Sequence, residues 1–474
     1  MGYLPFVKEG DEKQMHKLYR DLSNKYGEIF QITFGLQPPT IVLNTPRVMR
    51  EAYKRYEFSY RYLSPVLQLV AKAGEDYITF ANGERWHFCR KVANRSIGTF
   101  LKLNTIEDNF YIVGEWLCKQ LNKSIAEGVS VTTKAPLVRC TGAMMTSVTF
   151  GASPDPDDLL HDKLIDLIET FFACYEKAYA VEVYPPLEKL YSSTLQTFYR
   201  STSAFVQHVR AEMRKHIYRE GEQAKTIADT IYKCINEFTE QEKATAKITN
   251  EDILNAVVEI FDAGFFTTAE NIEWSLVILA CYPKVQKKVQ EEIDQKITVP
   301  GKPTIKDDFF KLHYCRAVVT EVLRYATNVA LGLPHCVFED VQIDGYTVPK
   351  NSIVVANQYA INHDPSEFPD PDAFKPERFL RDDGTFDQEM SEKTVSFGNG
   401  KRRCPGEQLA KNQVFLFVVY LMSRMSVQLD LTSFDYHPLK GEFKGLTVMP
   451  CPHKLFFSHR HANTADEHEL IYQG

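Results

Sequence analysis

The chain has 474 residues, of which 44% are hydrophobic, and this composition suits a globular protein with a large core. Its formal net charge of −7 argues against nucleic acid as the main partner. The ten cysteines are scattered without a CxxC pair, which is typical of a reducing compartment and excludes a disulfide scaffold.

Helix and strand patterns follow one another in an uneven order. Helical periodicity up to about residue 28 precedes short strand signals at 29–34 and 40–43. Helical patterns dominate from 45 to about 326, and strands return at 344–349 and 353–356. Long helices are predicted at 83–96, 107–126, 135–150, 157–177, 194–219, 251–280 and 283–296. Since no linker, repeat or low-complexity stretch interrupts this order, residues 1–474 are predicted to form a single domain, mostly α with small β-sheets.

The sequence contains no run of about 18 apolar residues, so no segment is predicted to cross a bilayer as a helix. Its first five residues, Met-Gly-Tyr-Leu-Pro, carry neither a signal peptide nor a membrane anchor.

The predicted helix at 83–96 carries Trp86 and Arg90 four residues apart on one face. An indole N–H and a guanidinium placed in this way can clamp a carboxylate. The pattern equally suits an amphipathic helix that packs its tryptophan into the core, and this segment alone leaves both interpretations open.

The predicted helix at 251–280 is mostly apolar and contains Ala-Gly-Phe-Phe-Thr-Thr at 263–268. Asp262 lies one turn before Phe266, on the same face. A carboxylate in so apolar a segment is costly unless water or a ligand satisfies it, which indicates a functional role, although an acid beside a water channel is the other interpretation. The hydroxyl of Thr267 either serves a ligand or bonds back to a carbonyl one turn earlier.

Glu321 and Arg324 lie three residues apart on one helix face. An exposed pair of this kind contributes at most about 1 kcal/mol and carries little information by itself.

A glycine-rich, cationic loop at 397–406 reads Phe-Gly-Asn-Gly-Lys-Arg-Arg-Cys-Pro-Gly and precedes a predicted helix at 407–423. Cys404 would then lie at a helix N-terminus, where free N–H groups and the positive end of the dipole stabilise a thiolate. Gly398 and Gly400 permit a tight turn, and Arg402 adds a cation. A buried, inert cysteine is the alternative for Cys404 taken alone.

This loop resembles the cysteine-ligand loop of the cytochrome P450 family, in which phenylalanine, glycine, arginine, cysteine and glycine recur at this spacing. The match falls on Phe397, Gly400, Arg402, Cys404 and Gly406. The resemblance covers essentially the whole chain and implies the cytochrome P450 fold. It also implies that haem b, iron protoporphyrin IX, is bound through the Cys404 thiolate.

The resemblance assigns further residues. The haem propionates would be held by Trp86, Arg90, His335 and Arg402, and Gly398 and Gly406 would complete the loop beside the haem. Ala263 and Gly264 would leave room for O₂ beside the iron, and Thr267 would assist its activation. Glu321, Arg324 and Arg378 would form a buried charge network with a structural role.

One position departs from the family pattern. The family usually carries an acid that relays protons where this chain has Phe266. Asp262 is therefore expected either to replace that relay or to hold a polar or cationic substrate. Phe266, Val329, Leu333 and Leu446 are expected to line the substrate cavity, although core packing explains the three aliphatic residues equally well.

By this resemblance the protein is a monooxygenase that inserts one oxygen atom of O₂ into an apolar steroid, lipid or foreign compound. Its electrons would come from NADPH-cytochrome P450 reductase, with cytochrome b5 as a further donor. The docking face would carry Lys91, Arg95, Lys401, Arg403 and Lys411. The chain starts about where the family's proline-rich hinge ends, which places it on the cytoplasmic face of the endoplasmic reticulum membrane if an N-terminal anchor has been removed.

Two rivals remain open: a haem-thiolate isomerase or dehydratase that rearranges peroxides, and a non-catalytic haem protein that senses a gas. Phe266 favours the isomerase and Thr267 disfavours it. The histidines at 459, 461 and 468 have no rigid spacing and are expected to belong to a solvated tail, not to a metal site.

Overall fold

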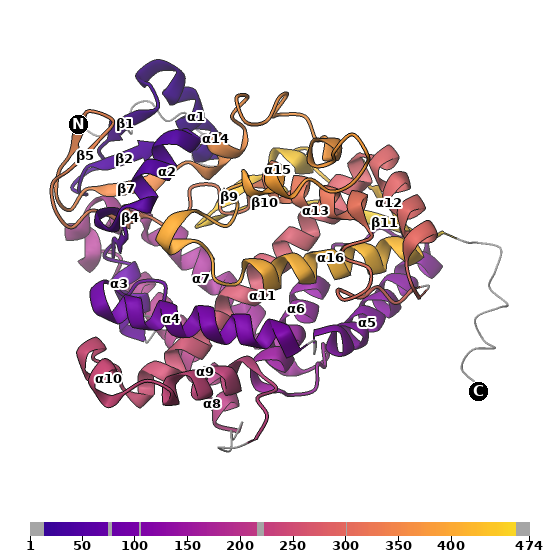
Figure 1. Ribbon diagram of the computed structural model, residues 1–474, viewed down its shortest axis with the longest axis horizontal. Helices are drawn as coiled ribbons and strands as arrows, with labels where there is room; N and C mark the ends of the chain where they lie inside the picture. Colours follow the sequence, from indigo (N-terminus) through magenta and orange to yellow (C-terminus); the bar gives the residue numbers. More distant parts are fainter. Residues whose placement is uncertain (1–13, 74–77, 104–105, 216–221, 300, 461–474) are drawn as a thin grey trace.

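The structure is a computed structural model that describes residues 14–73, 78–103, 106–215, 222–299 and 301–460 (Figure 1). The N-terminal residues 1–5 and two of the tail histidines, His461 and His468, lie outside the described residues. Within them, no helix is long and apolar enough to cross a membrane, and no group of three or more His, Cys, Asp or Glu side chains is placed to hold a metal ion.

Helices make up most of the described chain and follow the predicted pattern closely. The prediction at 283–296 is confirmed to the residue, and the predicted helix at 251–280 extends by one residue at each end. The helices are α1 (Met15–Tyr26), α2 (Pro46–Lys54), α3 (Leu67–Ala73), α4 (Gly83–Phe100), α5 (Ile106–Glu127), α6 (Lys134–Phe150), α7 (Leu159–Val183), α8 (Ser192–Lys215), α9 (Ile227–Asn236), α10 (Glu240–Ala246), α11 (Asn250–Cys281), α12 (Pro283–Lys296), α13 (His313–Ala326), α14 (Gln358–Asn362), α15 (Gln388–Glu392) and α16 (Glu407–Arg424).

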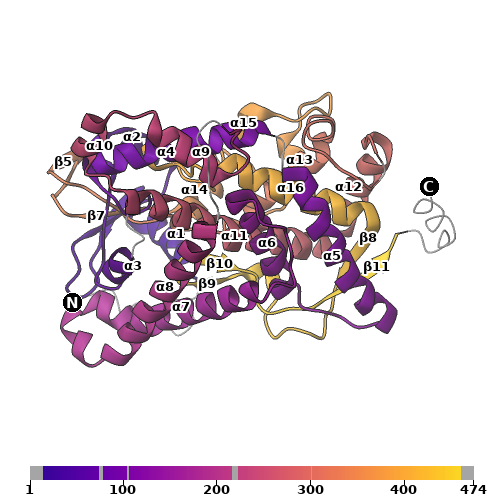
Figure 2. The same ribbon diagram turned by 90° about the horizontal axis from the view of Figure 1, so that it is seen from below.

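The described strands form four small sheets, of which the largest lies at the left of the helical body in Figure 1. The sheet made of β8 and β11 lies at the opposite end, near α12 (Figure 2). The largest sheet has the order β1-β2-β7-β4-β3, so it joins the first strands of the chain to strands that lie some 300 positions later. The strands are β1 (Ile29–Ile32), β2 (Thr40–Leu43), β3 (Tyr60–Arg61), β4 (His335–Cys336), β5 (Val341–Ile343), β6 (Tyr346–Val348), β7 (Ile353–Ala356), β8 (Met425–Leu429), β9 (Glu442–Lys444), β10 (Thr447–Met449) and β11 (Leu455–His459).

Helix α11 runs through the centre of the molecule and packs against α6, α13 and α16 (Figures 1 and 2). It begins at a capping box formed by Thr249 and Asp252, which satisfies two of the free N–H groups at its start. The close approach of α6 needs Gly264, because a Cβ there would lie 2.6 Å from Cε of Met145. These contacts fix the middle of α11 in the core.

A separate apolar cluster joins α3, α7 and α8, on the far side of α11 from α4 (Figure 2). Val66, Val70, Val181 and Phe198 are each at most 2% exposed in this cluster. Beside it, the buried Glu182 accepts a hydrogen bond of 2.6 Å from the hydroxyl of Ser64. The fold thereby places a second layer of helices over the centre of α11.

Candidate active site

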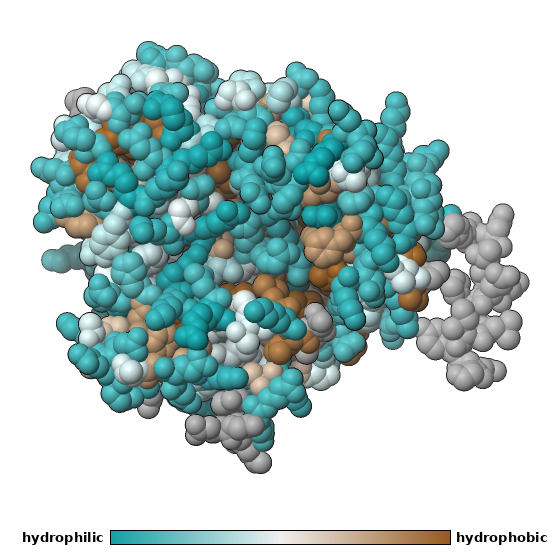
Figure 3. Space-filling view, viewed as in Figure 1, coloured by the Kyte–Doolittle hydropathy of each residue, from teal (hydrophilic) through white to brown (hydrophobic). Residues whose placement is uncertain are grey.

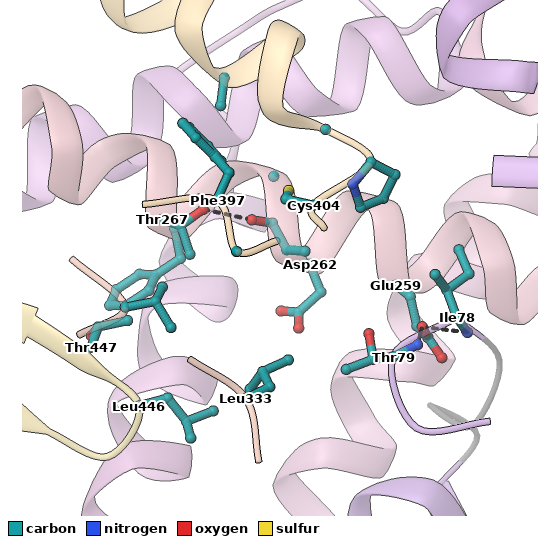
Figure 4. Close-up of a pocket in the computed structure, with 18 of the residues that line it drawn as sticks. Ile78, Thr79, Glu259, Asp262, Thr267, Leu333, Phe397, Cys404, Leu446 and Thr447 are labelled. Carbon is teal, nitrogen blue, oxygen red and sulfur yellow. Dashed lines mark hydrogen bonds between the residues drawn. The ribbon is translucent and has the colours of Figure 1, made fainter. Parts of the chain in front are cut away.

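An internal cavity of about 440 Å³ lies between α11 and the loop that precedes α16 (Figure 4). Its lining includes Cys404 from the loop and Asp262 and Thr267 from α11, while most of the remaining lining is apolar. Leu333 and Leu446 enter from two further loops, as Figure 4 shows. The fold therefore brings together candidate residues that are scattered through the sequence.

The backbone of the loop at 397–406 fixes the position of Cys404. Its N–H donates to the carbonyl of Phe397 at 2.8 Å. Gly398 and Gly400 both have left-handed backbone angles, with φ of 76° and 67°. A Cβ at Gly400 would lie 2.0 Å from the carbonyl oxygen of Tyr53, so no larger residue fits there. The predicted tight turn is confirmed, and Cys404 lies three residues before the start of α16.

The exposed surface of Cys404 faces the cavity, because Cys404 is one of the residues that line it. Burial raises the pKa of its thiol, because a thiolate is poorly solvated there. The N–H of Gly406 and the guanidinium groups of Arg90 and Arg403 act in the opposite direction on this pKa. The protein thus stabilises the thiolate form of Cys404 only in part, and a metal ion bound to the sulfur would stabilise it further.

Three arginines line the same cavity: Arg61, Arg90 and Arg402. None of them forms an ion pair with a carboxylate among the residues that the structure describes. Arg402 instead donates to the carbonyls of Ser59 at 2.7 Å and Ala81 at 2.6 Å. Burial, together with the charges of Arg61 and Arg90, lowers its pKa to about 8. Such a cluster of buried cations is costly unless anionic groups enter it.

Trp86 and His335 complete this cationic corner. The guanidinium of Arg402 lies 4.1 Å from the centroid of the buried Trp86 ring, and the indole Nε1 has no hydrogen-bond partner among the described residues. His335 bonds through Nδ1 to the carbonyl of Phe58 at 2.6 Å, and its ring stacks on Tyr53. Because burial holds the pKa of His335 well below its usual value, the arginines carry the positive charge.

This donor set fits haem b. The two propionates of haem would supply the negative charge that the three arginines lack. Two buried N–H groups, Nε1 of Trp86 and Nε of Arg61, have no hydrogen-bond partner among the described residues, and a propionate could accept from them. Cys404 would ligate the iron on the side of the loop, and Ala263, Gly264, Phe397 and Gly406 line the same space. Arg61 was missed in the sequence, because it stands in a two-residue strand with no motif around it.

The middle of α11 forms the opposite wall of the cavity. Ala263, Gly264 and Thr267 all line it, as the resemblance implies. The hydroxyl of Thr267 donates to the carbonyl of Ala263 at 2.7 Å, which is the back-bonded arrangement considered for this residue. Its oxygen can still accept a hydrogen bond from a ligand in the cavity. The close approach of α6 also requires a glycine at position 264, because a Cβ there would collide with Met145.

Two acids of α11 also line the cavity: Asp262 and Glu259. Glu259, a residue that sequence analysis missed, accepts hydrogen bonds of 2.8 Å from the N–H groups of Ile78 and Thr79 (Figure 4). Asp262 has no hydrogen bond or ion pair with the described part of the chain. Burial, and secondarily the charge of Glu259, raises the pKa of Asp262 to about 7.

The predicted substrate residues Phe266, Val329, Leu333 and Leu446 all line the cavity. The centroid of the Phe266 ring lies 5.2 Å from that of Phe172 on α7. Further aromatic and aliphatic residues of α7 and α8 were missed, because their pattern in the sequence is the same as that of core residues. They are Leu167, Phe171, Phe172 and Phe205.

The charge network predicted around Glu321 is confirmed. Glu321 and Arg324 are fully buried, and Oε2 of Glu321 accepts from Nε of Arg324 at 2.7 Å. Oε1 accepts from Nε of Arg378 at 3.1 Å and from the N–H of Lys375 at 2.8 Å. Arg324 also donates to the carbonyl of Asn362 at 2.8 Å, so the network ties α13 to the chain that leads to the cysteine loop.

The predicted basic face is less positive than its composition indicates. Helix α4 lies toward the viewer in Figure 1, and the same face is mainly hydrophilic in Figure 3. Lys91 and Arg95 pair there with Glu242 and Glu237. Near the cysteine loop, Arg403 and Lys411 both pair with Glu407, at 2.6 Å and 2.8 Å. Lys401 is exposed and forms no ion pair within the described residues.

Comparison with known proteins agrees with this geometry. Residues 1–457 match the family model described as "Cytochrome P450". The chain is 28% identical over 444 residues to cytochrome P450 1A1 of Limanda limanda, covering 90% of this chain and 82% of that protein. It is 29% identical to cytochrome P450 1A1 of Cavia porcellus, covering 89% and 84%. A zebra fish cytochrome P450 structure with progesterone has a TM-score of 0.81 at 24% identity, covering 94% of this chain and 99% of that one.

Cys404 lies shortly before α16 and faces a cavity lined by three arginines that have no ion-pair partner among the described residues, an arrangement that fits a haem-thiolate site. The chain belongs to the cytochrome P450 family. It has the cytochrome P450 fold and binds haem b, and it is a monooxygenase that acts on a small molecule with electrons from a redox partner. No comparison supports the isomerase or gas-sensor alternatives.

Arg61 provides a test of the proposed propionate contacts. We expect Arg61→Gln to release haem about tenfold faster or more, because one charged hydrogen bond to a propionate contributes about 1.5–3 kcal/mol. The haem-free protein should be no less stable, since the variant removes a buried cation without an ion-pair partner. Haem transfer to excess apomyoglobin and urea unfolding of the apoprotein measure the two effects, with the exposed Arg47→Gln as control. An unchanged rate of haem release would show that Arg61 does not hold a propionate.

Proposed function

We propose that the chain oxidises apolar small molecules of the steroid, lipid or xenobiotic class. The observation that carries this proposal is the cavity itself, in which mainly apolar walls surround the space between Cys404 and the centre of α11. Relatives named cytochrome P450 1A1 and a zebra fish structure with progesterone support the same class.

We assign the site residues as follows. Cys404 ligates the iron, while the haem supplies the activation of O₂ and the insertion of one oxygen atom into a substrate C–H bond. Arg61, Arg90 and Arg402 hold the propionates, together with Trp86 and His335. The hydroxyl of Thr267 is placed to take part in proton transfer on the α11 side, with its oxygen oriented by the bond to Ala263. Asp262 either supplies protons there in place of the acid missing at Phe266 or anchors the substrate.

NADPH-cytochrome P450 reductase is the electron donor that we propose, with cytochrome b5 as a second donor. The exposed Lys401 beside the cysteine loop supports docking of an acidic partner on that side. With a reductase of this kind as donor, we also propose the cytoplasmic face of the endoplasmic reticulum membrane as the protein's location, if an N-terminal anchor has been removed.

One experiment separates this function from its rivals. Purified holoprotein is supplied with NADPH and reductase in one reaction, and with a lipid hydroperoxide but no reductase in another. We expect substrate oxidation that needs both NADPH and O₂ in the first reaction, with one labelled oxygen atom from ¹⁸O₂ in the product. Fast rearrangement of the hydroperoxide without NADPH would favour the isomerase. A gas sensor would be favoured if neither reaction showed turnover for any ligand that binds the protein and shifts its Soret band.

A further inference from the structure

The charges that line the cavity do not balance on the α11 side. The charged or titratable residues that line the whole cavity are Tyr53, Arg61, Arg90, Arg402, His335, Cys404, Glu259 and Asp262. The arginines are taken up by the haem propionates, and the Cys404 thiolate by the iron. Glu259 is satisfied by the N–H groups of Ile78 and Thr79. Asp262 is left as an acid that opens onto the cavity and has no partner among the described residues.

The cavity onto which Asp262 opens has features that suit a bound cation. Aromatic rings of Phe171, Phe172, Phe205 and Phe266 line the same cavity, and the negative faces of such rings attract an ammonium group. The carboxylate would supply the full counter-charge, which is the arrangement that stabilises a desolvated cation best. The cations that line the cavity are Arg61, Arg90 and Arg402 at the propionate corner, and no lysine lines it. Lys134 of α6 lies outside the lining, 6.0 Å from the centroid of the Phe266 ring.

The hydrogen bonds favour an anchor over a proton relay. The Thr267 hydroxyl donates to the carbonyl of Ala263, so it does not donate to Asp262. In Figure 4 the carboxylate of Asp262 points into the open cavity, toward the level of Leu333 and Glu259. Asp262 and Thr267 are therefore not joined by a direct hydrogen bond.

We propose that Asp262 selects substrates that carry a cationic nitrogen, and that it binds this nitrogen while the apolar remainder lies against the walls of the cavity. This inference rests on the proposed monooxygenase function and adds the substrate class. It makes Asp262 a specificity-determining residue for that reaction.

The test uses two probe ligands of equal shape and different charge. 4-Phenylbutyl-trimethylammonium is permanently charged and cannot coordinate iron, and in its neutral isostere a tert-butyl group replaces the trimethylammonium group. Dissociation constants for the ferric holoprotein are measured by Soret titration at pH 8. We expect the wild type to prefer the ammonium ligand about tenfold to hundredfold, because the carboxylate attracts the ammonium charge in a partly desolvated site.

Asp262→Asn keeps the size and hydrogen-bonding capacity of the side chain and removes its charge. It should lose the preference for the ammonium ligand, while its affinity for the neutral isostere changes less than threefold. The exposed Asp307→Asn is the matched control and should behave as the wild type. The wild-type preference should also fall from pH 8 to pH 6, because protonation of Asp262 removes the counter-charge.

The proposal is overturned if the wild type fails to bind the ammonium ligand or binds its isostere equally well, or if Asp262→Asn keeps the preference. Increased peroxide release by Asp262→Asn with an unchanged ligand preference would assign the residue to proton delivery instead. Failure of the proposed function is distinguishable, because it would appear as absent NADPH-dependent turnover of every substrate, charged or neutral.

Discussion

Replacement of Glu321 by alanine should prevent the accumulation of folded, haem-loaded protein. The carboxylate is fully buried and is the only ion-pair partner that the described residues offer to Arg324 and Arg378. Its removal leaves two guanidinium groups inside the protein without an opposing charge. Breaking a buried pair in this way costs about 3–5 kcal/mol, which is a large part of the 5–15 kcal/mol that typically separates folded from unfolded protein.

The measurement is the ratio of haem absorbance to protein in the soluble fraction, with urea unfolding of whatever folds. Glu377→Ala is a matched control, because Glu377 lies in the same region and pairs on the surface with Lys288 at 2.7 Å. That change should cost less than about 1 kcal/mol. A stable, haem-loaded Glu321→Ala protein that is merely slower in turnover would show that the network acts in catalysis and not in folding.

The helices were predictable because their apolar residues recur with the helical period. The segment at 283–296 begins with a proline, which fits the first turn of a helix, and both of its ends were predicted correctly. Strand β3, with its two residues Tyr60 and Arg61, has no period to detect. It exists because it pairs with His335 and Cys336, some 270 positions later, and such pairing leaves no local signal.

The site shows the same division. Cys404 and its glycines were found because the turn demands those residue types in consecutive positions. Arg61 and Glu259 were not found, since each acquires its role from a partner that the fold supplies. Glu259 lies on a helix face that reads as ordinary until residues 78 and 79 bring their N–H groups to it. Likewise, Glu270 is buried with hydrogen bonds to Asn328 and Thr447, and burial raises its pKa to about 8.

The charge cluster at the propionate corner also could not be predicted. Arg402 was expected there, but the sequence did not show that the fold places Arg61 and Arg90 beside it. Their charges disfavour a further buried cation and lower the pKa of Arg402 further than burial alone does. The same arrangement explains why the site suits a dianionic cofactor. It holds three cations before any ligand enters, and two propionates placed beside them would relieve their repulsion.

Cys404→Ala should abolish thiolate ligation, and the ferrous CO complex should lose its red-shifted Soret band. Burial raises the pKa of the Cys404 thiol, so the apoprotein favours the neutral form, and the bound iron is what holds the sulfur as a thiolate. Alanine offers no donor atom at this position, and none of the other described residues of the loop at 397–406 carries a sulfur.

Cys404→His separates loss of the ligand from loss of the fold. It should retain haem through its imidazole while giving the CO spectrum of a histidine-ligated haem. Cys281→Ala removes a half-buried cysteine at the end of α11, outside the cavity lining, and should keep the red-shifted band. Persistence of that band in Cys404→Ala would mean that another cysteine ligates the iron. The arginine cluster would then have to hold haem in a different orientation, because the loop, the propionate corner and α11 are placed around the same cavity.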